Sequence, residues 1–66
     1  SVRGKSVIIE IKVAKTYQGL EEKCDEALRQ IEEQKYEAAL QHEGYQKILK
    51  YGVAFYKKEC MVKMGE

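Results

Sequence analysis

The chain has 66 residues, a net charge of only +1 and 35% charged residues. This length allows one domain at most, and so short a chain buries too little apolar surface to be stable without a staple or a partner. No apolar run approaches the roughly 20 residues of a membrane span, and no segment is typical of a signal peptide, so we expect a cytoplasmic protein without a membrane partner. Cys24 and Cys60 lack a C-x-x-C pair or a histidine cluster, which argues against zinc, and we expect two buried, reduced thiols.

The first predicted element is a strand over residues 7–14, which is rich in β-branched residues but contains Glu10 and Lys12. The period of two along a strand places these two charges on one face, with Cα atoms roughly 6.5 Å apart, close enough to act on one ion, water or phosphate. The opposite face carries Val7, Ile9, Ile11 and Val13. We expect this apolar face to pack in the main core and both charges to point away from it. Residues 1–6 are typical of a hairpin turn, and we expect its first arm to lie upstream of Ser1.

The second predicted element is a helix. Thr16 suits its N-cap, and from Leu20 onward the apolar residues recur at helical spacing. The stripe consists of Leu20, Cys24, Ala27, Leu28 and Ile31. Such a stripe is typical of a helix that packs one side on a core. We expect this helix to end near Lys35.

A second, shorter helix is predicted from Tyr36 to about His42, with Gly44 suited to the left-handed position that follows a helix. Its residues toward the core are expected to be Tyr36, Ala39 and Leu40. His42 would lie near its C-terminus, where a contact with the helix dipole is a better assignment than catalysis.

Beyond Gly44 the period returns to two. One face of a strand over residues 48–56 carries Leu49, Tyr51, Val53 and Phe55. The other face carries Ile48, Gly52, Ala54 and Tyr56. Because both faces are largely apolar, we expect this strand in the centre of a sheet. Residues 57–59 suit a charged turn into a last strand over residues 60–64. The order strand, helix, short helix, strand, strand predicts a mixed α/β (α+β) fold.

The charges are distributed unevenly. Residues 18–43 contain eight acidic and three basic side chains, whereas the rest of the chain contains three acidic and nine basic ones. This pattern is compatible with a basic sheet face that meets phosphates and an acidic helix turned to solvent. The basic candidates for contact with nucleic acid are Arg3, Lys5, Lys15, Lys47, Lys50 and Lys57.

The segment Glu10-Ile11-Lys12 resembles the E-x-K half of the PD-(D/E)XK nuclease signature. Residues 27–36, and residues 51–55 with the internal Gly52, are similar to the C-terminal nuclease domain of bacterial proteins that carry an AAA-ATPase-like domain upstream. The resemblance extends from Ser1 to about Met64. It implies that residues 1–66 form the C-terminal part of a restriction-endonuclease-like domain.

The resemblance also implies site residues. Glu10 would be a metal ligand, the backbone carbonyl of Ile11 a further ligand, and Lys12 the residue near the attacking water. Gln30 would correspond to the helix glutamine of RecB-like nucleases, although there a tyrosine follows at four positions and here Tyr36 follows at six. These roles imply Mg²⁺-dependent hydrolysis of nucleic acid phosphodiesters.

The chain departs from this signature because no Asp or Glu precedes Glu10. We therefore expect Mg²⁺ in an intact parent, but neither tight binding nor cleavage by this chain alone. The alternatives are a non-catalytic protein-interaction module and a degenerate nuclease that still binds nucleic acid. Glu10 and Lys12 would then be only an ion pair on a solvated strand. The unpaired edge of the first strand predicts a homodimer or another strand-paired self-association.

Overall fold

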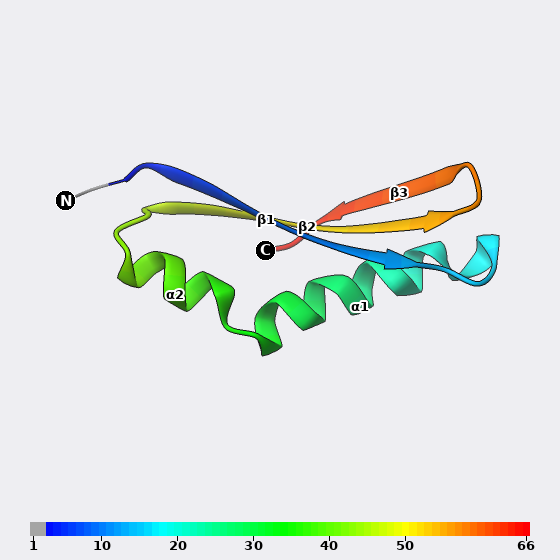
Figure 1. The fold of residues 1–66 in the computed structure, drawn as a ribbon, viewed down its shortest axis with the longest axis horizontal. Coiled ribbons are helices and arrows are strands. Elements are labelled where there is room, and N and C mark those ends of the chain that lie inside the picture. The colour runs from blue at the N-terminus through cyan, green and yellow to red at the C-terminus, as the bar shows by residue number, and fades with distance from the viewer. Residues whose placement is uncertain (1–2) are drawn as a thin grey trace.

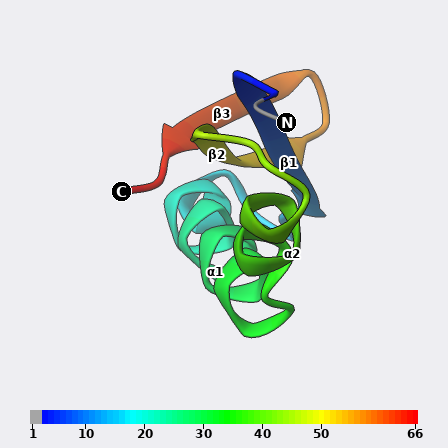
Figure 2. The same ribbon diagram turned by 90° about the vertical axis from the view of Figure 1, so that its left-hand side faces the viewer.

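The computed structural model describes residues 3–66. Its elements are β1 (Lys5–Val13), η1 (Tyr17–Gly19), α1 (Leu20–Glu33), α2 (Tyr36–His42), β2 (Lys47–Tyr56) and β3 (Glu59–Met64). The predicted order and mixed fold class are confirmed, with the short 3-10 helix η1 added between β1 and α1. The strands form one sheet, and both helices lie on the same side of it (Figures 1 and 2). The fold therefore has two layers.

The sheet has the strand order β1-β2-β3, which confirms the central place predicted for β2. β1 and β2 are parallel, and their register sets Glu10 beside Gly52 and Lys12 beside Ala54. β2 and β3 are antiparallel and are joined by a tight turn in which Lys57 has a φ of 53°. Within residues 3–66, β1 is thus an edge strand whose outer side pairs with no other strand.

The element boundaries follow the local sequence. The Thr16 hydroxyl accepts a hydrogen bond from the Gly19 amide at 3.1 Å. Thr16 is therefore the N-cap of η1, which leads directly into α1. α1 and α2 are separated at Lys35, which has a left-handed φ of 57°, and Gly44 follows α2 with a φ of 103°. β1 already begins at Lys5, so Lys5 and Ser6, which were predicted to lie in a hairpin turn, belong to the strand. Ser1 and Val2 lie outside the described residues.

The core lies between α1 and the sheet. Its buried apolar residues are Ala14, Leu20, Cys24, Ala27, Ile31 and Ala54. The closest approach is at Gly52, where an added Cβ would lie 2.4 Å from the Cys24 carbonyl oxygen. The Cys24 thiol donates a hydrogen bond to the Met61 carbonyl at 3.3 Å, and burial raises the pKa of this thiol. α1 therefore sits directly on the backbone of β2.

The prediction that the apolar face of β1 packs in the core is wrong, because this face is exposed. Val7, Ile9, Ile11 and Val13 are 52%, 57%, 58% and 74% exposed. Glu10 and Lys12 instead lie on the half-buried side that the helices cover. The reason is the small size of their neighbours in β2, Gly52 and Ala54, which leave room for α1 where larger side chains would not.

Two smaller predictions also fail. Cys60 is exposed rather than buried. α2 buries none of its residues, since Tyr36 is 42% exposed, Ala39 is exposed and only Leu40 is half-buried. α2 therefore covers the sheet loosely. No helix in the described part of the chain is long and apolar enough to span a membrane.

Candidate functional site

The fold brings Lys12 and Gln30 together although they lie on different elements. Lys12 projects from the helix-covered side of β1, and its Nζ donates a hydrogen bond to Gln30 Oε1 on α1. The Lys12 side chain remains 26% exposed, so its ammonium is held at the surface of the layer and not buried inside it. The contact thus joins two of the residues that the family resemblance singles out.

Glu26 also belongs to this site, although no sequence motif indicates it. Its Oε1 lies 4.0 Å from Lys12 Nζ, and its Oε2 lies 3.1 Å from Lys23 Nζ. The hydrogen bond from Lys23, with a smaller contribution from Lys12, lowers the pKa of Glu26 below its ordinary value. The signal was its spacing, because Glu26 precedes Gln30 by four positions and so shares its side of α1. We refer to Lys12, Lys23, Glu26 and Gln30 as the Lys12 cluster.

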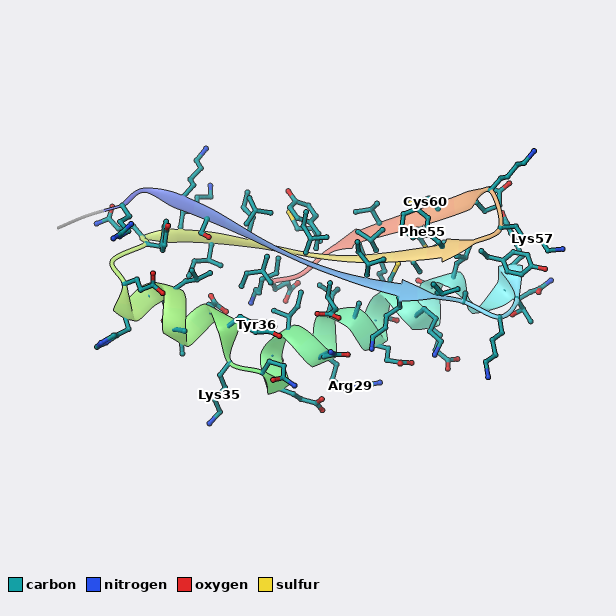
Figure 3. All side chains as sticks on the ribbon, in the orientation of Figure 1. Arg29, Lys35, Tyr36, Phe55, Lys57 and Cys60 are labelled. Carbon is teal, nitrogen blue, oxygen red and sulfur yellow. The ribbon has the colours of Figure 1, made fainter. Side chains whose placement is uncertain are left out.

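Glu10 lies on the same side of β1 as Lys12 but opens into a different space. It lines a groove of about 490 Å³ along β1 and α2, together with Tyr36, Leu40 and Glu43. Figure 3 shows Tyr36 at the junction of the two helices. Lys12 pairs with Glu26, and no ion pair joins it to Glu10 within the described residues. The ion pair expected for a solvated strand is therefore not formed there.

The described residues do not complete a metal centre. Within residues 3–66, no three or more His, Cys, Asp or Glu side chains gather closely enough to hold an ion. Glu10 offers one carboxylate, and the exposed side chain of Ile11 lies on the opposite face of the sheet, which leaves its backbone carbonyl as its contribution. Mg²⁺ requires near-octahedral oxygen coordination and loses its water reluctantly. These groups therefore fit one side of a magnesium site and do not form the whole of it.

The basic residues do not form a single phosphate-binding face. Lys50 is buried, and its Nζ donates to Glu37 Oε1 at 2.8 Å, so the suggestion that Lys50 meets nucleic acid is wrong. Arg3 is exposed, but its Nε donates to the Glu43 carbonyl at 3.1 Å. The exposed lysines among the basic candidates are Lys5, Lys15, Lys47 and Lys57. The cationic surface is thus smaller than the sequence suggested.

One of three comparisons with known proteins gives a match. A family profile described as the PD-(D/E)XK nuclease superfamily matches residues 2–65. No curated protein and no solved structure gives a significant match. The matched region includes Glu10-Ile11-Lys12, both α-helices and all three strands. The chain therefore belongs to the PD-(D/E)XK nuclease superfamily.

Proposed function

We propose that this chain supplies one wall of a Mg²⁺-dependent nuclease site that acts on nucleic acid phosphodiesters. The observation that carries the proposal is the hydrogen bond of Lys12 to Gln30 beside the half-buried Glu10, in a member of a nuclease superfamily. Residues 1–66 would be the C-terminal part of the nuclease domain, in a cytoplasmic protein with an AAA-ATPase-like domain upstream. The remaining metal ligands would come from outside this chain.

Each residue has a distinct role in this proposal. The metal, when bound, would polarise the phosphate and lower the pKa of a bound water. Glu10 and the backbone carbonyl of Ile11 would each hold it from one side. Lys12 would place its ammonium near the attacking water and an oxygen of the phosphate. Gln30 would accept a hydrogen bond from one of the three N–H groups of the Lys12 ammonium and thereby orient it.

A second candidate is a protein-association module that has lost its catalytic function. The incomplete ligand set favours it, as do the unpaired edge of β1 and the uncovered face of the sheet within the described residues. We propose accordingly that the chain forms a homodimer. The exposed lysines would allow such a module to retain contact with nucleic acid.

The cleavage assay that tests the nuclease proposal uses the gene product extended upstream of Ser1. We expect Mg²⁺-dependent cleavage, at least about a hundredfold loss of rate for Glu10→Gln and Lys12→Ala, and a smaller loss for Gln30→Ala. Lys58→Ala is the matched control, because Lys58 lies in the exposed turn between β2 and β3. Full activity of Glu10→Gln in an active protein would refute the assignment.

Magnesium titration of the 66-residue chain, followed by NMR, tests the incomplete site separately. One carboxylate leaves the ion with too few charged ligands. We therefore expect weak chemical-shift changes that do not saturate below roughly millimolar Mg²⁺, the concentration range of weak oxygen-ligand sites. Saturable shifts confined to Glu10 and Lys12 at micromolar metal would contradict this expectation. They would mean that the chain forms the site alone.

A further inference from the structure

The largest unexplained feature of the molecule is the side of the sheet that faces away from the helices, which we call the bare face. It consists of Val7, Ile9, Ile11, Val13, Leu49, Tyr51, Val53, Phe55, Cys60, Val62 and Met64. Figure 3 shows Phe55 and Cys60 on this side, away from α1 and α2. The bare face carries no charged side chain among these residues. Lys5 and Lys47, which are neighbours in the register, lie at one end of it.

The bare face is too large and too apolar for a monomer in water. Seven of its large side chains are between 40% and 74% exposed. Each exposes on the order of 100 Å² of apolar surface, so together they present roughly 700 Å². This exceeds the few hundred Å² that monomeric proteins usually expose in one patch. A parallel strand pair such as β1 and β2 is also normally covered on both faces. Within residues 3–66, therefore, nothing covers this face of the sheet.

We propose that a second copy of this chain covers the bare face, in a twofold dimer with the two sheets packed face to face. The roughly 700 Å² presented by one copy is close to the about 800 Å² per partner of a stable interface. A twofold interface places the same patch of both copies in contact. An apolar patch without charges can therefore pack against its own copy without like-charge repulsion. Two twisted sheets of β-branched and aromatic residues can interdigitate at a spacing of about 10 Å.

The dimer would not compete with the proposed nuclease site. Alternation along β1 puts Glu10 and Lys12 on the helix side and Ile9 and Ile11 on the bare face. The two copies would therefore carry their Lys12 clusters on opposite outer surfaces. The shape of the single chain is consistent with this arrangement, because its radius of gyration of 13.2 Å exceeds the about 11 Å expected for a compact domain of this length. Dimerisation does not depend on the nuclease proposal.

Sedimentation equilibrium of the 66-residue chain tests the proposal. We expect a monomer–dimer equilibrium with a dissociation constant on the order of tens of micromolar. Phe55→Lys should weaken it by at least about tenfold. Phe55 lies on the central strand, so this change acts on the bare face and not on an edge. Gln34→Lys adds the same charge at the exposed end of α1 and should leave the dimer unchanged.

A second variant keeps the test valid if Phe55→Lys does not fold. Val62→Lys alters a side chain that is 56% exposed on β3, and far-UV circular dichroism would establish that it is folded. It should weaken the dimer to a similar extent. A soluble paramagnetic probe should broaden the methyl signals of Ile9, Ile11 and Val62 less as the protein concentration rises.

Three results would overturn the proposal. The first is a monomer throughout the concentration range. The second is a dimer, or a larger assembly, that survives both lysine substitutions, which would place the contact at the edge of β1. The third is a monomeric protein, extended upstream of Ser1, whose bare-face methyls are shielded from the probe, which would assign the face to that upstream segment.

Discussion

Glu10 and Lys12 are neighbours on one face of β1 but have different environments. Lys12 is fixed by Gln30 and lies near the Glu26 carboxylate, whereas Glu10 faces the open groove beside α2. The proposed nuclease function would require this difference, because a lysine that orients water must be held still and a metal ligand must stay accessible. The acidic helix α1 thus accounts for Lys12 on this strand, whereas Glu10 is accommodated by the open groove.

Gly52 is the residue on which this arrangement depends most. Because a Cβ at this position would lie 2.4 Å from the Cys24 carbonyl, we expect Gly52→Ala to push α1 away from β2 and to lower the free energy of unfolding by about 2–3 kcal/mol. Urea unfolding measures this change. Gly65→Ala is the control, since its added Cβ would meet the end of the Leu28 side chain at 3.0 Å and Lys50 Cβ at an ordinary contact distance of 3.4 Å. We expect a loss below about 1 kcal/mol. Equal stability of both variants would contradict the close approach of α1.

Part of the site was accessible from the sequence. The E-x-K pattern and the helix glutamine single out Glu10, Lys12 and Gln30 as candidates, and the fold places Lys12 against Gln30. Glu26 was missed because the family motif does not mention it, although helical spacing sets it one turn before Gln30. Tyr36 lines the groove with Glu10, and only the break at Lys35 allows a tyrosine at this spacing to do so. Motifs identify residue types, whereas contacts across layers depend on packing.

The helices and strands themselves follow from periodicity, and their order is confirmed. Periodicity could not decide which face of β1 enters the core, because it defines two faces without ranking them. Hydrophobicity favours the face with Val7 and Ile9, but close packing on Gly52 and Ala54 in β2 selects the other one. The small residues on one face of β2 were the available signal. An apolar face is buried only where another element can reach it.

An ion pair between the buried Lys50 of β2 and Glu37 of α2 connects these two elements. The Lys50 side chain is 8% exposed and its partner Glu37 is 39% exposed. Removing the carboxylate leaves a poorly hydrated ammonium, so we expect Glu37→Ala to destabilise the chain by about 1–2 kcal/mol. Lys50→Met removes the charge and keeps much of the volume, so its effect should lie within about 1 kcal/mol of zero, in either direction.

The double variant Lys50→Met with Glu37→Ala separates these two effects. Thermal unfolding should show it to be more stable than Glu37→Ala alone, because the unpaired ammonium is gone. If Glu37→Ala instead matched the wild-type chain, Lys50 would be solvated and its apparent burial would carry no energetic weight. The comparison uses the same two positions throughout, so differences in helix propensity affect both carboxylate variants equally.

On the scale of the whole molecule, the charge asymmetry along the sequence becomes an attraction between layers. Four of the five ion pairs in the described residues join a lysine of the sheet, Lys12, Lys50 or Lys63, to a carboxylate of a helix. The acidic helices are therefore not only a solvated surface, and three of the sheet lysines face them rather than external phosphates. This corrects the interpretation of a basic sheet turned outward. The exposed pairs are individually weak, but all act in the same direction.

This layering predicts how stability depends on pH. Hydrogen bonds to Asp25 and then Glu21 raise the pKa of Lys63 above its ordinary value of 10.5, so its contribution is complete below pH 10.5 and is lost as the pH rises through the raised pKa. Glu26 behaves in the opposite sense. The hydrogen bond from Lys23 lowers its pKa below 4.5, so its contribution is present above pH 4.5 and is lost as the pH falls through the lowered pKa.

Thermal unfolding followed across the pH range measures both effects. We expect a melting temperature that is nearly constant between about pH 5 and pH 10 and declines on either side. Lys63→Met should lower the plateau and reduce the alkaline decline, because the group that titrates in contact with α1 is gone. Lys58→Met, in the exposed turn, should keep the wild-type profile. If Lys63→Met and Lys58→Met gave the same alkaline limb, the ion pairs of Lys63 with Asp25 and Glu21 would contribute nothing to holding β3 against α1.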